Sequence, residues 1–333
     1  MDRVRIGCLG AARIAPAALV KPARGVADAE VTAVAARDAT KARAFAAKHG
    51  IPVVHESYEA LLADPDIDAV YNPLPNGLHA LWTIRALDAG KHVLCEKPFT
   101  ANAAEAEQVA AAAERTGLTV MEAFHWRYHP LAARMLEIVQ GGELGPVRHI
   151  ETWMCFPLFQ RGDIRWQLDL AGGALMDAGC YAVHMLRTLA GEEPAVTGAH
   201  ALLRSPGVDR RMRADFRFAD GRTGRITTSM WSTTVLRIAA RVDGERGSLR
   251  VFNPTAPQYF HRMSVRVDGR TRREKVRGSS TYAYQLAAFT AAVLRGQPTL
   301  TPPSDSIATM QVIDDIYRAA GMEPRKGAIE LAG

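Results

Sequence analysis

Short apolar runs alternate with longer amphipathic stretches over the first part of the chain. Strand-like runs rich in branched residues occupy 4–9, 30–36, 52–55, 68–72, 92–96 and 118–123. Helical patterns lie between them, at 41–49, 57–63, 77–89 and 102–116. Strands that are apolar along most of their length and alternate with helices are typical of a parallel sheet covered on both faces. Six of them predict a doubly wound Rossmann sheet in an α/β protein.

The pattern changes after Pro130. A helix is predicted over 130–140, and a strand-rich region follows from 147 to 268, interrupted by a helix over 173–190. Its strands alternate polar and apolar residues, which favours a large open, mostly antiparallel sheet with helices on one face. Helices over 282–295 and 304–320 close the chain. We therefore expect a nucleotide-binding domain over 1–123 and a substrate-binding and oligomerisation domain over 124–333, joined without a long linker.

Composition and charge leave this picture unchanged. Apolar residues make up 48% and charged residues 23%, as in ordinary globular proteins, and no apolar run approaches the ~20 residues of a membrane span. The net charge is +6, but the basic clusters at 210–213 and 270–277 are not interleaved with aromatic residues. They indicate solvated strand edges and not a nucleic-acid site. The chain begins directly with a strand pattern, and four scattered cysteines suit a reducing compartment. The prediction is a cytoplasmic protein.

A glycine turn follows the first strand. It reads Gly10-Ala11-Ala12-Arg13-Ile14 and leads to a proline at 16, a residue tolerated in the first turn of a helix. Such a turn places bare backbone N–H groups at a helix N-terminus, where a pyrophosphate binds. Of the three glycines in the dinucleotide-binding pattern only the first is present, with alanine at 12 and 15. A plain strand–helix turn therefore stays open as the alternative.

Arg37 and Asp38 end the second strand. A carboxylate at this place binds the ribose 2′-hydroxyl of NAD, whereas an arginine accommodates the 2′-phosphate of NADP. Arg37 comes directly off the strand, and Asp38 is equally suited to cap the following helix. We predict NADP as the cofactor, with NAD as the alternative.

Three residues suggest acid–base chemistry. Lys97 stands at the carboxyl end of the fifth strand, where α/β sheets bind ligands, and Pro98 restricts its backbone. Asp177 and Tyr181 are four residues apart in an apolar helix and so share a face. A buried carboxylate needs a partner such as an ammonium, and a nearby ammonium lowers the pKa of a tyrosine. Tyr181 would then exchange a hydroxyl proton while a hydride moves. The alternative is an ordinary hydrogen bond on a helix face.

The chain resembles the glucose–fructose oxidoreductase/inositol dehydrogenase (Gfo/Idh/MocA) family over essentially its whole length. The resemblance rests on GAARIA (10–15), AARD (35–38), YNPLPNGLH (71–79), AGKHVLCEKP (89–98), MEAFHWRYHP (121–130) and GGALMDAGCYAVH (172–184). It implies a Rossmann domain, a large open sheet and Lys97, Asp177 and Tyr181 as the catalytic set. Inositol-type members have histidine where this chain has Tyr181. The tyrosine indicates the branch of dimeric dihydrodiol dehydrogenases and NADP-dependent aldose (D-xylose) dehydrogenases.

The same resemblance implies further cofactor contacts, although asparagine and proline also simply form turns. They follow the fourth and fifth strands, at Asn72, Pro73, Leu74, Asn76, His79, Glu96, Lys97 and Pro98.

Aromatic and cationic residues in the second domain are candidates for substrate contacts. Such side chains can stack on a sugar or bind its hydroxyls, though large aromatics more often belong to a core. The candidates are Trp126, Arg127, Phe156, Trp166 and Tyr282. His125 and His129 have the spacing of a metal pair but no third ligand is evident, so no metal is expected.

We therefore expect an NAD(P)-dependent oxidoreductase acting on a carbonyl or alcohol carbon of a sugar, polyol, diol or dicarbonyl. The alternatives are a hydrolase or lyase that uses tightly bound NAD in a transient oxidation, and a non-catalytic NADP sensor. A homodimer or homotetramer is also expected, because the region 195–268 has too few helices to cover both faces of its sheet. Its alternating strands place Ile226, Met230, Ile238 and Ala240 on one side, which we expect to be an exposed apolar face. Members of the family pair through such a face. The alternative is a monomer in which helices from 282–320 cover that face.

Overall fold

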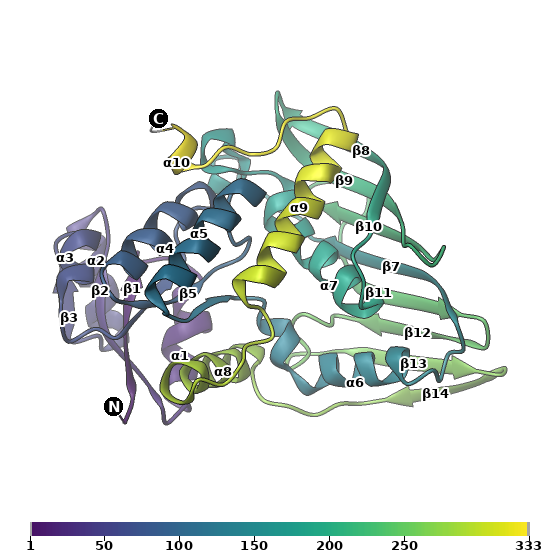
Figure 1. Cartoon of the computed structure of the whole chain (residues 1–333), viewed down its shortest axis with the longest axis horizontal. Helices are drawn as coiled ribbons and strands as arrows, with labels where there is room; N and C mark the ends of the chain where they lie inside the picture. The colour runs from purple at the N-terminus through teal and green to yellow at the C-terminus, as the bar shows by residue number, and fades with distance from the viewer. Residues whose placement is uncertain (1, 332–333) are drawn as a thin grey trace. The chain divides into compact units, whose positions relative to one another are not determined.

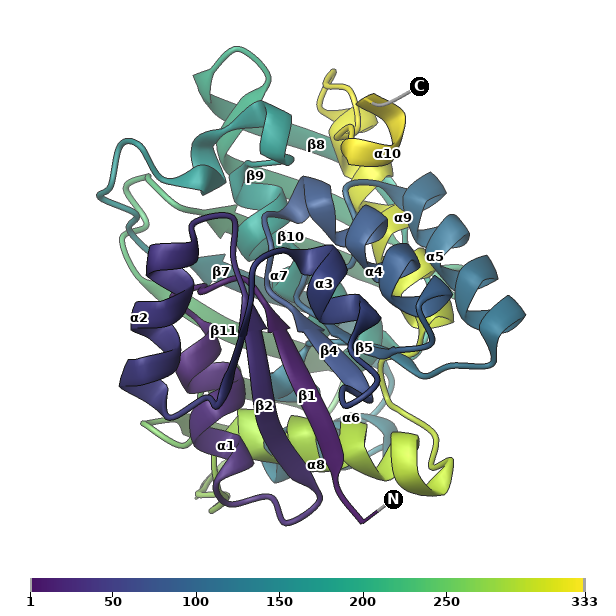
Figure 2. The same cartoon turned by 90° about the vertical axis from the view of Figure 1, so that its left-hand side faces the viewer.

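A six-stranded parallel sheet forms the centre of the first unit of the computed structural model, which describes residues 2–331. Its strand order is β3-β2-β1-β4-β5-β6, and every pairing is parallel. This is the order of a Rossmann fold, so the predicted doubly wound sheet is confirmed (Figure 2). The strands are β1 (Val4–Leu9), β2 (Ala29–Ala35), β3 (Val53–His55), β4 (Ala69–Asn72), β5 (His92–Cys95) and β6 (Val120–Glu122).

Capping residues set the helix limits in this unit. Asp38, Ser57 and Asn102 each accept a hydrogen bond from a backbone N–H in the first turn of the helix that follows. Gly50 and Gly117 end two of the helices in the left-handed conformation. The helices are α1 (Lys21–Ala23), α2 (Ala39–His49), α3 (Tyr58–Ala63), α4 (His79–Asp88) and α5 (Ala103–Thr116), with a π-helical turn over Pro16–Val20 before α1.

The division of the chain differs from the predicted one in its second half. The first break falls after His125, close to the expected boundary at 123, but Tyr282–Ile307 and the chain from Gly327 on belong to the first unit. These segments include most of α8 (Thr281–Arg295) and α10 (Ala328–Leu331). Thr301 explains part of the difference, because it exchanges two hydrogen bonds with the backbone of Glu122 in β6, at 2.7 and 3.1 Å. The second domain is therefore not continuous over 124–333.

The second unit contains an eight-stranded sheet with the order β14-β13-β12-β11-β7-β10-β9-β8 (Figure 1). All pairings are antiparallel except that of β7 with β10, so the predicted mostly antiparallel sheet is confirmed. Its strands are β7 (Val147–Cys155), β8 (Ala195–Ser205), β9 (Val208–Arg217), β10 (Thr223–Ser229), β11 (Arg237–Gly244), β12 (Gly247–Phe252), β13 (Arg262–Val267) and β14 (Arg270–Glu274). Its helices are α6 (Pro130–Gln140), α7 (Cys180–Ala190) and the larger part of α9 (Pro303–Ala319).

One face of this sheet is covered from within the unit. Thr152 of β7 donates a hydrogen bond to the carbonyl of Ala182 in α7 at 2.8 Å. Ile226 and Ala240 lie on this face, opposite Thr152 in the two neighbouring strands, and both are buried. Met230 is also buried and Ile238 is half-buried. The expectation of an exposed apolar face was therefore wrong, because these side chains point toward the helices and form the core.

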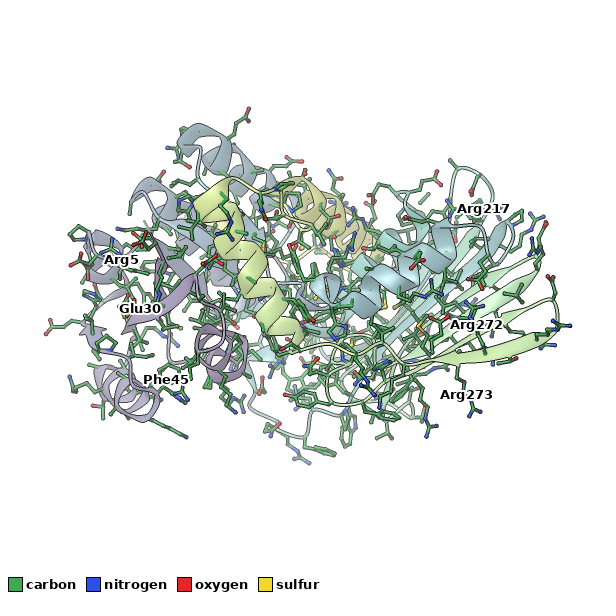
Figure 3. All side chains as sticks on the ribbon, turned by 90° about the horizontal axis from the view of Figure 1, so that it is seen from below. Arg5, Glu30, Phe45, Arg217, Arg272 and Arg273 are labelled. Carbon is green, nitrogen blue, oxygen red and sulfur yellow. The ribbon has the colours of Figure 1, made fainter. Side chains whose placement is uncertain are left out.

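The opposite face is rich in arginine. The register gives it three carboxylates, Glu151, Asp215 and Asp243, against ten arginines. Figure 3 labels two of these arginines, Arg217 on β9 and Arg273 on β14. The ten are Arg211, Arg213, Arg217, Arg225, Arg237, Arg241, Arg250, Arg262, Arg266 and Arg273. We call this the arginine face. Its charge follows from strands in which every second residue is polar.

Candidate active site

The glycine turn joins β1 to the first helical turn of the first unit. Gly10 has a φ of +104°, a conformation that L side chains rarely adopt, and its N–H donates to the carbonyl of Ala35 at 2.7 Å. Ala11 and Ala12 are half-buried, and Arg13 and Ile14 are exposed. The turn thus keeps an accessible backbone at the carboxyl end of β1, as the sequence predicted.

Arg37 and Asp38 have different roles after β2. The Asp38 carboxylate accepts from the N–H groups of Thr40 and Lys41 at 3.0 and 3.1 Å, and these bonds hold its pKa below the ordinary value. Asp38 is therefore the N-cap of α2, one of the two roles that the sequence allowed. Arg37 is exposed at the carboxyl end of β2, where an arginine can reach a phosphate.

The loop after β4 is held by its own side chains. Asn72 is fully buried and donates to the carbonyl of His79 and the hydroxyl of Thr83, both at 3.1 Å. The ring of His79 is also buried, and its two nitrogens lie 2.7 Å from the carbonyl oxygens of Leu74 and Pro98. His79 thereby connects the loop after β4 with the loop after β5. Its imidazole therefore holds the two predicted cofactor loops together through their backbone carbonyl groups. Pro73 and Asn76, two other predicted contacts, are half-buried in this loop.

Glu96 and Lys97 follow β5. The Glu96 carboxylate accepts from the Tyr71 hydroxyl at 2.7 Å and from the Lys97 N–H at 3.3 Å. Burial, together with the Glu96 charge, raises the pKa of Tyr71 well above its ordinary value. Lys97 is half-buried, and its peptide bond to Pro98 is cis. Glu96 is therefore tied to the core, whereas Lys97 lies at the strand end where the sequence placed it.

Asp177 lies in a π-helical turn, Leu175–Gly179, and not in the continuous α-helix that the sequence predicted. Its carboxylate forms an ion pair with Arg165, whose Nε lies 2.9 Å from Oδ2. Arg165 also donates to the carboxylate of Asp163 at 3.2 Å. The charge of Asp177, and to a smaller extent that of Asp163, raises the pKa of Arg165. The residue pairing with Asp177 in this unit is thus an arginine that sequence reasoning missed.

Tyr181 follows in the first turn of α7, and 6% of its surface is exposed. Asp177 is 8% exposed, so the carboxylate and the phenol are both nearly buried. A carboxylate at this depth requires the charged partner that Arg165 supplies. The arrangement places an ion-paired carboxylate four residues before a nearly buried phenol.

The predicted substrate residues divide into two groups. The indole of Trp126 is fully buried and donates to Nδ1 of His184 at 3.1 Å. The prediction that Trp126 contacts the substrate was therefore wrong, and we assign this residue to the core. Trp166 is 7% exposed, with the guanidinium of Arg204 4.5 Å from its ring centre. The remaining three are half-buried and stay candidates for substrate contacts: Arg127, Phe156 and Tyr282.

The two histidines considered as a metal pair have other partners. Nδ1 of His129 accepts from the N–H of Leu131 at 3.0 Å and so caps α6. The ring of His125 packs against Tyr282 with 4.1 Å between ring centres. Burial, with a smaller effect of the Lys97 charge, lowers the pKa of His125 to about 3. Within residues 2–331, no three His, Cys, Asp or Glu side chains lie together as metal ligands would.

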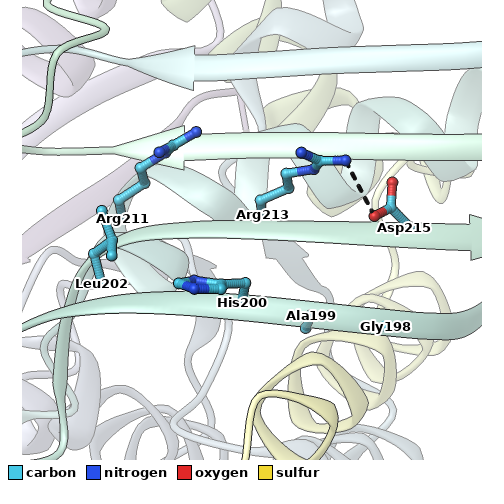
Figure 4. Close-up of a pocket in the computed structure, with 7 residues that line it drawn as sticks. All are labelled: Gly198, Ala199, His200, Leu202, Arg211, Arg213 and Asp215. Carbon is cyan, nitrogen blue, oxygen red and sulfur yellow. Dashed lines mark ion pairs between the residues drawn. The ribbon is translucent and has the colours of Figure 1, made fainter.

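A hollow of about 350 Å³ lies over the paired strands β8 and β9, on the arginine face (Figure 4). Its lining residues are Gly198, Ala199, His200, Leu202, Arg211, Arg213 and Asp215. In it the carboxylate of Asp215 lies 3.6 Å from the guanidinium of Arg213. None of the predicted catalytic residues lines this hollow, so it is distinct from the candidate active site.

The first unit fits a dinucleotide. A Cβ built on Gly10 would lie 3.4 Å from Cδ2 of Leu74, so a larger residue would close the space beside the turn. The half-buried backbone of Ala11 and Ala12 suits a pyrophosphate, and the exposed guanidinium of Arg37 suits a 2′-phosphate. Among the described residues, no helix is both long and apolar enough for a bilayer span.

Comparison with known proteins covers both units. A model of the oxidoreductase family with an NAD-binding Rossmann fold matches residues 4–124, and a model of the GFO/IDH/MocA C-terminal domain matches 132–250. The chain is 40% identical over 319 residues to D-xylose 1-dehydrogenase (NADP(+)) 2 of Haloferax volcanii, covering 94% of this chain and 96% of that protein. It is 36% identical over 332 residues to dTDP-3,4-didehydro-2,6-dideoxy-alpha-D-glucose 3-reductase of Streptomyces violaceoruber, covering 95% of each.

Solved structures agree with these sequence relationships. A 3-ketoreductase from Actinomadura kijaniata, in complex with NADP and TDP-benzene, matches with a TM-score of 0.90 at 30% identity, over 96% of this chain and 98% of that one. An aldose–aldose oxidoreductase from Caulobacter crescentus, complexed with glycerol, gives a TM-score of 0.89 at 27% identity over the same shares. The resemblance seen in the motifs is thereby confirmed: the chain is an NAD(P)-dependent oxidoreductase and belongs to the Gfo/Idh/MocA family.

Proposed function

We propose that this oxidoreductase moves a hydride reversibly between NADP and a carbonyl or alcohol carbon of a sugar-like or polyol substrate. The exposed Arg37 after β2 supports NADP, and Asp38, the carboxylate that would favour NAD, is used as a helix cap. Two relatives point the same way by their names, an NADP-dependent D-xylose dehydrogenase and a reductase of a dTDP-linked sugar.

Tyr181 is the acid and base in this proposal. NADP, when bound, supplies or accepts the hydride. In the reductive direction the Tyr181 phenol donates its proton to the substrate oxygen, and in the oxidative direction it takes the hydroxyl proton back. Lys97 assists with its positive charge, which favours the phenolate and polarises the substrate oxygen. Asp177 orients these groups, and its ion pair with Arg165 fixes its carboxylate.

The ion pair between Arg165 and Asp177 is the observation that carries the proposal. It places a fixed carboxylate four residues before a nearly buried tyrosine, inside an otherwise apolar helix. The Asp177 side chain is 9% exposed and that of Arg165 is 38% exposed, so the arginine reaches from the solvent side to a nearly buried carboxylate. Burying a carboxylate is unfavourable unless it is paired, and a helix that only supports the core has no need of one. Groups with shifted pKa values cluster at functional sites, and the charge of Asp177 raises the pKa of Arg165.

The test is a substrate panel followed at the NADPH absorbance band. Aldoses, cyclic polyols, diols, dicarbonyls and dTDP-linked keto sugars should be compared with NADP(H) and NAD(H). We expect turnover with at least one sugar-like compound and a preference for NADP(H). If no compound changes the absorbance while the purified protein carries bound nucleotide, the enzyme works instead by transient oxidation and the proposal is wrong. A protein that binds NADP without any turnover would be the sensor considered above.

We also propose that two or four copies assemble through the arginine face. Neighbouring strands place Asp215, Arg225, Glu151 and Arg241 side by side, a row of alternating charge that a second copy turned by a twofold axis can complement. Trp153 lies next to this row but is only 7% exposed, and the guanidinium of Arg237 lies 3.6 Å from its ring centre, so the surface offered to a second copy there is cationic.

We also propose a cytoplasmic location. The four free cysteines, Cys8, Cys95, Cys155 and Cys180, are all buried and unoxidised, which suits a reducing compartment.

Light scattering at micromolar concentration tests the assembly. We expect a mass of two or four chains at physiological salt and smaller species in low salt, because the face carries ten arginines against three carboxylates and their mutual repulsion is screened least there. A mass near 36 kDa, that of one chain, at physiological salt would rule the assembly out.

A further inference from the structure

The two glycines before the π-helical turn tie two segments of the second unit together. The N–H of Gly172 donates to the carbonyl of Gln167 at 2.8 Å, and the N–H of Gly173 donates to the carbonyl of Arg165 at 2.9 Å. A Cβ on Gly172 would lie 2.6–2.7 Å from these two carbonyl oxygens, so only glycine permits the contact. The segment that carries Arg165 is therefore bonded directly to the start of the helix that carries Asp177.

A buried charged cluster lies behind this glycine turn. Oδ1 of Asp209 accepts from Nη2 of Arg325 at 2.8 Å and from the hydroxyl of Tyr317 at 3.0 Å. The side chain of Asp209 is 0% exposed and that of Arg325 is 2% exposed, so both charges are removed from water. The guanidinium of Arg325 also lies 4.1 Å from the ring centre of Tyr317. The three side chains come from β9, the end of α9 and the segment after α9.

The cluster is bonded to the backbone on both sides of Gly173. Nε of Arg325 donates to the carbonyl of Gly172 at 2.8 Å, and Oδ2 of Asp209 accepts from the N–H of Leu175 at 2.7 Å. A Cβ on Gly173, whose φ is +135°, would lie only 2.2 Å from Oδ1 of Asp209. The carboxylate and the guanidinium thus fill the space against the glycine backbone and fix its direction.

Gly173 is the junction between this cluster and the Arg165–Asp177 pair. Its N–H is bonded to the carbonyl of Arg165, and its carbonyl accepts from the N–H of Asp177 at 3.1 Å. Both members of the ion pair are therefore held through one residue, and that residue is held by Asp209 and Arg325. Buried ion pairs seldom add net stability compared with apolar packing, so a role in specifying geometry is the better explanation for one at this position.

We propose that Asp209, Arg325 and Tyr317 are positioning residues for the reaction: they hold the Gly172–Gly173 turn so that Arg165 and Asp177 meet in the orientation that Tyr181 requires. The inference rests on the proposed function, because it assigns these residues to the same site. None of the three needs to touch the substrate. They act on Arg165 and Asp177 through the backbone of Gly172, Gly173 and Leu175.

The mildest test is Tyr317→Phe, which removes one hydrogen bond from Asp209 and keeps the ring beside Arg325. We expect kcat to fall on the order of 10-fold while KM and the Kd for NADP stay within about twofold, since small displacements of reacting groups lower the rate steeply. The control is Tyr259→Phe, at a residue 82% exposed in the same unit, which should change nothing. Equal losses in both variants, or no loss in Tyr317→Phe, would contradict the proposal.

A second set of variants separates positioning from folding. Asp209→Asn alone leaves Arg325 buried without its counter-charge and is expected to unfold the unit. The double variant Asp209→Asn/Arg325→Gln removes both charges, so we expect it to fold with a stability near that of the wild type but a kcat lower by on the order of 100-fold. Arg325→Lys keeps the charge, but one ammonium group cannot bond to both Gly172 and Asp209. Its kcat should therefore lie between that of the double variant and that of the wild type. A folded double variant with wild-type kcat would overturn the proposal.

A spectroscopic readout makes the test independent of activity. Trp166 follows Arg165 and is nearly buried, so its fluorescence reports the segment that the glycine turn holds. We expect a shift of the Trp166 emission in Tyr317→Phe and in the double variant, obtained by difference from the same proteins carrying Trp166→Phe. If Tyr181→Phe retains full activity, the proposed function fails while this shift remains. If instead these variants show an unchanged Trp166 emission and a wild-type kcat, the positioning role is wrong while the proposed function stands.

Discussion

The candidate site residues of the two units lie on different kinds of structural element. In the first unit the residues lie on loops at the carboxyl ends of parallel strands, where Gly10, Arg37 and Lys97 follow β1, β2 and β5. In the second unit Asp177 and Tyr181 lie on a helix that covers a sheet, and a buried charged cluster fixes the turn before it. The first arrangement follows from the fold, whereas the second depends on a few particular side chains. Substitutions in the two units should therefore separate cofactor binding from catalysis.

The largest effect is expected from Tyr181→Phe. This variant removes the proton donor and leaves the ring, so kcat should fall on the order of 10²–10⁴-fold, the usual contribution of general acid–base catalysis. Folding and the Kd for NADP should stay close to those of the wild type, because the nucleotide residues belong to the other unit. Steady-state kinetics and fluorescence titration of NADP measure the two quantities. Wild-type turnover in a folded Tyr181→Phe protein would remove this residue from the mechanism.

Stability should distinguish the two faces of the large sheet. Phe216 and Arg217 are neighbours on β9, and Phe216 is 2% exposed on the covered face while Arg217 is exposed on the arginine face. Phe216→Ala should lower the free energy of unfolding by about 3–5 kcal/mol, and Arg217→Ala should change it by less than about 0.5 kcal/mol. Urea unfolding at one fixed protein concentration compares them. Arg217 lies outside the row from Asp215 to Arg241 that we propose as the contact between copies, so a large loss in Arg217→Ala would show that the contact extends over this part of the face as well.

Arg37→Ala should change only the affinity for the cofactor. Losing a charged contact to the 2′-phosphate should weaken NADP on the order of tenfold and leave NAD almost unchanged. At saturating NADP, kcat should equal that of the wild type. Equal weakening of both cofactors in a binding titration would show that Arg37 supports the fold and does not select NADP.

The smallest effect is on the pH dependence of stability, through a histidine of the second unit. Burial, together with the charge of His261, lowers the pKa of His129 to about 4, below the ordinary value of about 6.5. The unfolded chain therefore takes up this proton first, and stability is lost as pH falls from about 6.5 to about 4. His129→Asn keeps a capping side chain for Leu131 without titrating, so its stability should fall less over this window. Parallel unfolding curves at every pH would contradict this assignment.

The sequence predicts the first unit well because its signals are local. Strands buried on both faces are continuously apolar, and caps such as Asp38, Ser57 and Asn102 mark where helices begin. The predicted strand over 92–96 is observed as His92–Cys95, and the glycine turn and Arg37 follow their strands as expected. What was missed is non-local, since nothing near residue 301 reveals that Thr301 bonds to β6.

The second unit was harder to predict for the same reason. Alternation shows that a strand has two faces but not which of them the helices cover, and so Ile226 and Ala240 were placed on the wrong side. Arg165 had a weak signal, a charged residue shortly before two glycines. Asp209 had none, because it lies next to the basic run at 210–213, which reads as a solvated edge. Its role depends on Arg325, which is more than a hundred residues away in sequence.

The π-helical turn over Leu175–Gly179 constrains both chain length and residue identity. Such a turn contains about one residue more than a turn of α-helix, so deleting one residue would restore regular winding and leave the direction of the rest of α7 nearly unchanged. The deletion would, however, remove the wide turn between Asp177 and Tyr181 and change how these two side chains face each other. All five residues of the turn are buried, and a Cβ on Gly179 would lie 2.7 Å from Cδ1 of Leu175, so substitutions are restricted as well. This short stretch should therefore reject both deletions and most exchanges of residue type, in contrast to the surface loops between the strands.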